Sequence, residues 1–363
     1  MINEQLAELS NLALVVAIVL YVLALIGFSA DLASTSQRRS DARLAALDTQ
    51  EEARVLQSAT VASEGAAPEG AAPVATERAT GGPDVPDAVG EGTGARAPGA
   101  MTAQNFAFIL SVGATFLHVL GVLARAIATQ RVPWANMYEF ATTSSALVMV
   151  AFLVFSIKRA ELRTLGTFVV GPVLLLLLLA QTFWIVPAAA LTPSLQNSHW
   201  LIIHIGVAII ATALSILGAV VASLQLLQGR HEHALAEKTA AGEVLPEHWG
   251  RAGHVLDRLP SSTALESLSF RIHSIAFVCW TFTLMFGAIW AREAWGRFWG
   301  WDPKEVWTFI IWVIYAAYLH ARATGGFRGS RAAGLALAGF VAVVFNYTIV
   351  NTVINGLHSY SGL

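Results

Sequence analysis

Eight apolar stretches of about 20 residues run through this chain, and each is long enough to cross about 30 Å of hydrocarbon as a helix. A backbone inside a bilayer must satisfy its own N–H and C=O groups, so such stretches indicate transmembrane helices. The composition agrees, with 55% hydrophobic and 13% charged residues. The sequence therefore predicts an all-α, polytopic membrane helix bundle with about eight transmembrane helices. They are expected at about residues 11–29, 104–127, 138–157, 165–187, 200–228, 270–291, 306–321 and 332–354.

The region between the first and second stretches has a different composition. It is rich in Ala, Gly, Glu, Thr and Pro and has almost no aromatic residues, so it cannot bury a core of its own. We therefore expect an N-terminal transmembrane helix at 1–30, a disordered cytoplasmic linker at 31–103 and a main membrane domain at 104–363. The linker is expected to separate the first helix from the rest.

Lys and Arg gather in the loops of one side, which indicates the orientation of the chain. Cytoplasmic loops of membrane proteins carry an excess of these residues. If the N-terminus is outside, the cytoplasmic loops hold 17 of the 22 basic residues. Both termini are therefore expected on the outer side. The net charge of −2 gives no basis for a nucleic-acid partner.

The chain has a single cysteine, Cys279, which lies inside an apolar stretch. One cysteine can form neither an internal disulfide nor a C-x-x-C redox or metal pair. Any thiol chemistry associated with this protein is therefore expected to come from a partner.

A tryptophan-rich segment precedes the seventh apolar stretch. Tryptophan is common at membrane interfaces as an anchoring belt, but here Gly296, Gly300 and Pro303 interrupt the segment and permit a flat surface. Such a surface could stack against a large planar apolar ligand. Asp302 before Pro303 is also typical of a helix N-cap. The tryptophans are Trp290, Trp295, Trp299, Trp301 and Trp307.

Three histidines inside or next to apolar stretches are candidate ligands. Imidazole is costly in hydrocarbon without a partner, and neutral imidazole is a common iron ligand. His204 and His358 are expected near the outer face, and His320 near the inner end of the seventh stretch. Taken singly, each could be a hydrogen-bonded structural residue. Together, His204 and His358 beside one aromatic surface match bis-histidine ligation of haem, with His199 as a secondary candidate.

The other histidines are interpreted as structural or surface residues. Four of them fall in the polar cytoplasmic loop and are expected at the surface, and His273 is expected to be a packing or interface residue. The four loop histidines are His231, His233, His248 and His254.

A second polar group surrounds the start of the third stretch. Asn136 with Glu139 has the spacing of a helix cap, and a role in a pocket is an equal alternative. His118 and Arg125 share one helix face. From that face Arg125 could reach a carboxylate, either Glu139 or a haem propionate.

These motifs resemble the CcsA/ResC family of system II cytochrome c biogenesis. The resemblance covers about 104–363 and includes Asn136-Met-Tyr-Glu139, the segment from Trp290 to Trp307, and Gly356-Leu-His358-Ser-Tyr360. In that family the tryptophan-rich element is called the WWD domain, which here is the external segment 290–307.

The resemblance implies a haem transporter and a subunit of a cytochrome c synthase in the bacterial cytoplasmic (plasma) membrane. Haem b, held ferrous, would enter at a membrane site containing His320 and then be held outside by His204 and His358. The partners implied are a Ccs1/ResB-type membrane subunit, an apocytochrome c and a thioredoxin-like thiol reductant. Further residues expected at the haem are Trp295, Trp299, Trp301, Asp302 and Glu139.

Two other functions remain open at this point. A haem exporter or relay without ligase activity would use the same histidines, and the sequence does not separate it from a synthase. A multi-helix scaffold that only recruits partners would bind no chromophore.

Overall fold

The computed structural model describes residues 3–64, 101–189, 198–243, 246–324 and 326–358. All regular structure in these ranges is helical, which confirms the all-α prediction. Two of the elements are short helices of other types, the 3-10 helix η1 and the π-helix η2. The elements are α1 (Glu4–Glu64), α2 (Ala103–Thr129), α3 (Met137–Lys158), η1 (Ala160–Leu165), α4 (Gly166–Leu179), η2 (Ala180–Trp184), α5 (His199–Ala240), α6 (Arg251–Leu256), α7 (Ser262–Trp295), α8 (Pro303–Ala323), α9 (Ser330–Tyr347) and α10 (Ile349–Thr352).

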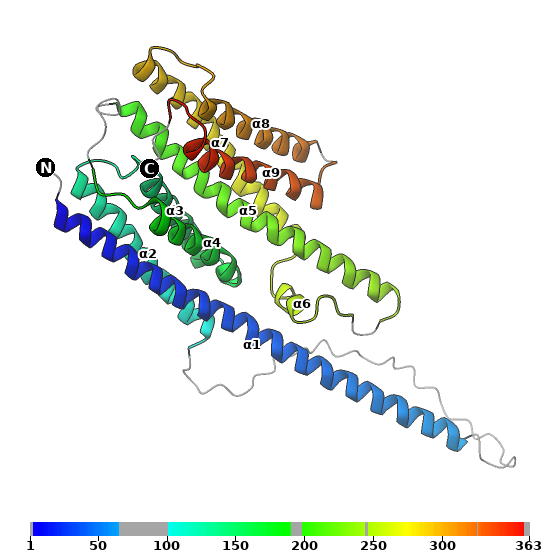
Figure 1. Ribbon diagram of the computed structural model, residues 1–363. Coiled ribbons are helices and arrows are strands. Elements are labelled where there is room, and N and C mark those ends of the chain that lie inside the picture. Colours follow the sequence, from blue (N-terminus) through cyan, green and yellow to red (C-terminus); the bar gives the residue numbers. More distant parts are fainter. Residues whose placement is uncertain (1–2, 65–100, 190–197, 244–245, 325, 359–363) are drawn as a thin grey trace.

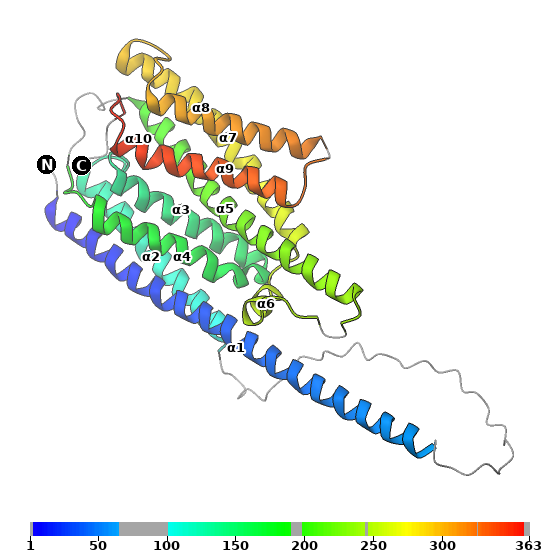
Figure 2. The same cartoon turned by 45° about the vertical axis from the view of Figure 1, so that its right-hand side comes forward.

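Eight helical segments of the described chain are long and apolar enough to cross a membrane, as the sequence predicted. The fourth combines η1, α4 and η2, and the eighth combines α9 and α10. An even number of crossings returns the chain to its starting side, and α1 begins at the same end of the bundle at which α10 lies (Figures 1 and 2). We call this the site end, and the end that carries α6 the far end.

The helices form two groups (Figures 1 and 2). One contains α1 to α4, and α5 packs with α7, α8 and α9 in the other. A large apolar core joins α1, α2, α3 and α4 to the middle of α5, and a second core lies among α5, α7, α8 and α9. Small residues bring α1 and α2 together, since a Cβ on Gly27 would lie only 3.0 Å from Cβ of Ala107.

The first helix extends well past the predicted boundary. α1 continues to Glu64 and projects beyond the far end (Figure 1), so the linker predicted from residue 31 is corrected over 31–64. Residues 65–100 of that linker lie outside the described residues. Ala, Leu, Arg, Gln and Glu dominate the extension, and all of them favour helix.

Contacts with α6 hold the first part of this extension against the bundle. Asp31 forms an ion pair with Arg258 at 2.7 Å, and Ser36 donates a hydrogen bond to the carbonyl oxygen of Arg251 at 2.9 Å. α1 also packs along α2 and α4. The first helix is therefore part of the bundle, and is not separated from it as the linker prediction implied.

The polar region after the fifth span is partly helical and buries two histidines that were expected at the surface. α5 continues to Ala240, and the α6 turn folds back against it. His231 is 2% exposed and makes a 2.9 Å contact with Asp257, and His254 is 8% exposed. The surface prediction is wrong for these two histidines, because α6, which contains His254, packs against α5, which contains His231. It is confirmed for His233, whose side chain is 75% exposed.

Candidate functional site

A cavity of about 610 Å³ opens at the site end, between the start of α3 and the helices of the second group. This volume falls within the range of about 300–1,000 Å³ that is usual for ligand pockets. The cavity lies beside the tryptophan-rich segment and takes walls from α3, α5, α7, α8 and α9. Its lining includes His199, His204, Trp290, Trp299, Lys304 and His358.

His204 reaches the cavity from the first turns of α5. Its Nδ1 lies 2.9 Å from the carbonyl oxygen of Thr283 in α7, which can only accept, so Nδ1 carries the proton. Nε2 is then left with a free lone pair. The ring fits because residue 287 is glycine, since a Cβ on Gly287 would lie 2.7 Å from Cε1 of His204. Thus α7 fixes both the position and the tautomer of this imidazole.

His358 reaches the same cavity from the segment after α10. Its Nδ1 donates to Oδ2 of Asp302 at 2.7 Å. The same carboxylate accepts the backbone N–H of Leu357 at 2.6 Å and that of Lys304 at 3.1 Å. Gly356 allows this approach, because a Cβ there would lie 2.7 Å from Oδ1 of Asp302. One aspartate therefore caps α8 and orients His358.

The charge of Asp302 is kept by its partners. Partial burial raises the pKa of the carboxyl group, but the hydrogen bonds from His358 and Leu357 outweigh it and hold the pKa below the ordinary value. Asp302 is therefore a carboxylate at neutral pH. Nδ1 of His358 keeps its proton, and Nε2 remains available as a ligand.

Trp290 contacts both histidines. Its ring is parallel to that of His204 at a centroid distance of 6.1 Å, and it meets His358 edge-on at 5.9 Å. Metal-bound histidines usually donate their second ring nitrogen to a carbonyl or carboxylate, as both of these do. Within the described residues, no group of three or more His, Cys, Asp or Glu side chains could hold a bare metal ion. Two neutral imidazoles with free Nε2 atoms could serve as ligands of an iron centre.

The tryptophans that were predicted to form one surface do not all lie in the same environment. Trp299 lines the cavity, whereas Trp295 contacts the edge of the His358 ring at 4.9 Å and supports it. Trp301 is 76% exposed, with a positive φ of 59°, and contacts Trp299 edge-on at 5.8 Å. Of these tryptophans, Trp290 and Trp299 thus line the cavity, Trp295 supports His358, and Trp301 is exposed. The Asp302 cap is confirmed, with Glu305 completing a capping box.

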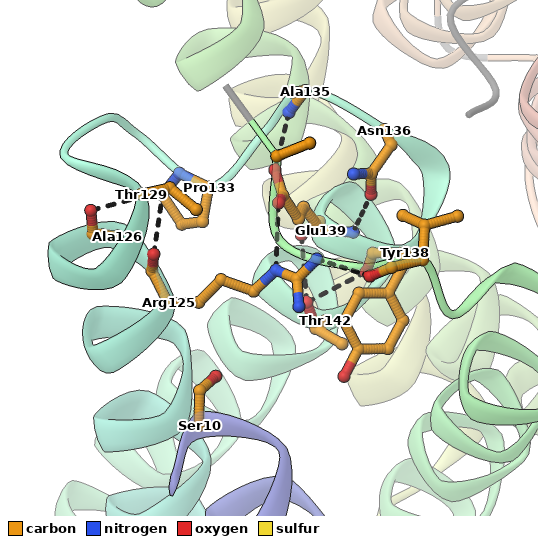
Figure 3. Close-up of polar contacts among 12 residues, drawn as sticks. Ser10, Arg125, Ala126, Thr129, Pro133, Ala135, Asn136, Tyr138, Glu139 and Thr142 are labelled. Atoms are coloured by element: carbon orange, nitrogen blue, oxygen red, sulfur yellow. Dashed lines mark hydrogen bonds and ion pairs between the residues drawn. The ribbon is translucent and has the colours of Figure 1, made fainter. Parts of the chain in front are cut away.

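Glu139 is fully buried and does not line the cavity. Figure 3 shows it near Arg125 and the backbone of Ala135. Oε1 accepts from Nε of Arg125 at 3.0 Å, and Oε2 accepts from Arg131 at 2.7 Å and from the Ala135 N–H at 2.9 Å. Asn136 caps α3 by accepting the Glu139 N–H at 2.9 Å. Glu139 thus holds the loop 131–136, of which Arg131 and Asn136 line the cavity, and would act on a ligand only through it.

His320 lies apart from the other two candidates. It is exposed on α8, in the last turn toward the far end. The structure therefore brings His204 and His358 to one cavity and leaves His320 at another depth, as the sequence suggested. Sequence reasoning missed Lys304 in the cavity wall and the Thr283 carbonyl. Gly287 inside an apolar helix was a usable signal, but a backbone carbonyl gives none.

The sequence that forms this site matches a family of known proteins. The family model described as "Cytochrome C assembly protein" matches residues 111–358, which include all three candidate histidines and the tryptophan-rich segment. The chain belongs to this family. Membership of the family places the chain in cytochrome c assembly, which implies the handling of haem, and confirms the resemblance to CcsA.

Individual relatives support the family assignment. A "Cytochrome c biogenesis protein CcsA" of Gloeobacter violaceus is 34% identical over 291 residues, which cover 68% of this chain and 84% of the relative. One of Heterosigma akashiwo is 34% identical over 254 residues, covering 64% and 77%. One of Prochlorococcus marinus is 32% identical over 268 residues, covering 69% and 83%.

Proposed function

We propose that this chain binds haem b in the cavity, with His204 and His358 as axial ligands, and presents it for covalent attachment to an apocytochrome c. The observation that carries the proposal is the pair of imidazoles at one cavity, each held through Nδ1 and free at Nε2. The fit of two such ligands to haem iron agrees with membership of a cytochrome c assembly family.

The attachment chemistry requires positioning more than a catalytic group. Each thiol of a Cys-x-x-Cys-His motif adds across a haem vinyl group, forming a carbon–sulfur bond while the thiol hydrogen passes to the other vinyl carbon. Holding the haem in register with the motif can lower such a barrier greatly. Cys279 is half-buried in α7 and does not line the cavity, so both thiols come from the apocytochrome. A thioredoxin-like reductant would keep them reduced, and ferrous iron would limit oxidative side reactions.

Haem would enter from the opposite side of the membrane. The bias of Lys and Arg supports placing the site end outside the bacterial cytoplasmic membrane and the far end inside. His320 is exposed on α8 toward the far end. It is therefore accessible to a second membrane subunit of Ccs1/ResB type, whose own histidine would complete an entry site.

Co-expression tests the proposal as a whole. The chain is produced with its partner subunit and a Cys-x-x-Cys-His apocytochrome in a host without other maturation genes, and covalent haem is measured by peroxidase staining after denaturing electrophoresis. The synthase predicts a covalent product. Delivery of haem without covalent product would indicate an exporter or relay, and purified protein without haem absorbance would indicate a scaffold.

His320→Ala is expected to reduce total haem loading in cells, because entry would lose a ligand. Haem added directly to the purified variant should still bind at the cavity with wild-type affinity. The measurement is haem content per protein after purification, beside an absorbance titration with added haem. His233→Ala removes an exposed histidine of the same end and serves as the matched control. Equal haem content in the two variants would refute the entry role.

Asp302→Asn is expected to lower haem affinity by about 10- to 100-fold, because loss of a carboxylate that orients a ligand histidine has effects of this size. The contribution of the Asp302 carboxylate to haem affinity is fully present at pH values above the ordinary Asp pKa. It is lost only as the pH falls through the lower pKa of the folded protein. At pH 7 and above, where Asp302 is ionised, the variant should therefore bind haem more weakly than the wild-type chain.

The same titration on Glu243→Gln, which neutralises an exposed carboxylate of the far end, controls for net charge. If Asp302→Asn bound haem with the same affinity as that control, Asp302 would act only as a helix cap.

A further inference from the structure

Lys304, the second residue of α8, is a cation of the cavity wall that contacts only neutral acceptors. Its Nζ donates to the carbonyl oxygen of Asn346 at 2.8 Å and to Oδ1 of Asn351 at 2.7 Å. Both acceptors belong to the end of α9 and to α10. The side chain also lines the cavity. Within the part of the chain that the structure describes, Lys304 forms no ion pair with any carboxylate.

The carboxylates nearest in the sequence are engaged elsewhere. Asp302 accepts from His358 and from the N–H groups of Leu357 and Lys304 itself, so its contact with residue 304 is through the backbone. Glu305 accepts from the N–H groups of residues 300 and 302 and forms an ion pair with Arg297 at 3.3 Å. Neither of these carboxylates forms an ion pair with Nζ of Lys304.

Arg131, the other cation of the cavity wall, differs in this respect. Its guanidinium makes two hydrogen bonds with Glu139, at 2.7 and 3.0 Å, and others with the carbonyl oxygens of Val132 and Ala189. Lys304 therefore stands out as a basic residue of the cavity wall that has no ion-pair contact with a carboxylate of the described protein.

A partly buried ammonium group without an ion-pair partner is unfavourable, and it has three N–H donors, of which two are used here. The geometry points to Lys304 as the subsite for an anionic group of the ligand, namely a propionate carboxylate of haem. This inference rests on the proposed function, because it takes haem as the occupant. A carboxylate in contact with Nζ would complete the donor set and balance the charge.

Such an ion pair would fix the rotation of the haem about its axial ligands, which the histidines leave free. Two axial imidazoles define a line through the iron, but they do not prevent the macrocycle from turning about that line. The two propionates share one edge of haem, and the vinyl groups lie on the other half. A propionate held where α8 meets α9 and α10 therefore sets the edge at which the vinyl groups are offered to the apocytochrome thiols.

The test compares haem with its dimethyl ester, in which both propionates are neutral, on the full chain in detergent. Lys304→Gln is expected to weaken haem binding by about tenfold, or about 1.4 kcal/mol, and to leave the ester affinity within about twofold of wild type. Lys304→Arg should retain most of the haem affinity, because it keeps the charge. Lys158→Gln, which removes an exposed lysine at the end of α3, is the matched control and should bind both compounds as wild type does.

Each outcome separates this inference from the proposal on which it rests. Equal weakening of haem and ester in Lys304→Gln would show that Lys304 only ties α8 to α9 and α10. The carboxylate subsite would then be wrong, and haem binding would stand. Absence of binding by either compound to the wild-type chain would overturn the proposed function, and the subsite with it. If the wild-type chain and every variant bound haem and its dimethyl ester with equal affinity, the carboxylate subsite would likewise be wrong.

Discussion

Replacing either cavity histidine by alanine is expected to abolish bis-histidine haem and the covalent product. His204 and His358 each supply one free Nε2 to the cavity, and no pair of ligands remains when one is lost. Because loss of a supporting partner alone costs about 10- to 100-fold in metal affinity, removal of the ligand itself should exceed about 100-fold. The measurement is the absorbance spectrum of the purified variant titrated with haem, beside peroxidase staining of co-expressed cytochrome.

Chemical rescue makes this prediction specific to the metal bond. His358→Gly leaves space where the imidazole was, and free imidazole added to the buffer should restore the six-coordinate spectrum. A variant that has simply lost its fold would not respond to imidazole. Wild-type haem affinity and wild-type covalent product in both alanine variants would rule out the ligand assignment.

Glu139→Ala is expected to cause a large loss of stability, about 3–5 kcal/mol, because it leaves two buried cations without their carboxylate. The side chains of Arg125 and Arg131 are 3% and 9% exposed, and both depend on Glu139. Glu139→Gln keeps one acceptor oxygen and should fall between alanine and wild type. Thermal unfolding in detergent, followed by circular dichroism, measures the difference.

The effect should extend to the cavity, because Arg131 forms part of its wall. Weaker haem binding is therefore expected in Glu139→Ala even at temperatures at which the variant is folded. Glu161→Ala, at an exposed position of η1, is the control and should unfold as wild type does. If the two variants unfolded at the same temperature, Glu139 would not be the residue that stabilises the two arginines.

The membrane architecture could be predicted from the sequence because hydrocarbon thickness imposes a length on every apolar helix. All eight predicted spans appear in the described chain. The ends of the helices outside the bilayer could not be predicted in the same way. Residues 31–64 lack aromatic side chains and were interpreted as disordered, yet good helix formers and contacts of Asp31 and Ser36 with the α6 region extend α1.

Part of the candidate site was also accessible from the sequence. His204 and His358 were identified because histidine near hydrocarbon requires a partner, and Asp302 was identified as a helix cap, which the structure confirms. Trp301, which was also assigned to the ligand surface, is 76% exposed and does not line the cavity, and its assignment stays a prediction. A list of tryptophans cannot show which ring faces inward, because the turn after Gly296 decides the direction of each one.

The sequence by itself determined the number of spans, the bias of Lys and Arg toward the loops of one side, and the histidines that are candidate ligands. Hydropathy, basic residues and imidazole chemistry are local properties, which can be read one segment at a time. Only the tertiary structure decided that Trp290 packs against both His204 and His358, that the Thr283 carbonyl fixes one imidazole, and that Lys304 forms no ion pair with a carboxylate among the described residues. These are relations between segments far apart in the chain, and packing of α5, α7, α8 and α10 sets the distances on which they depend.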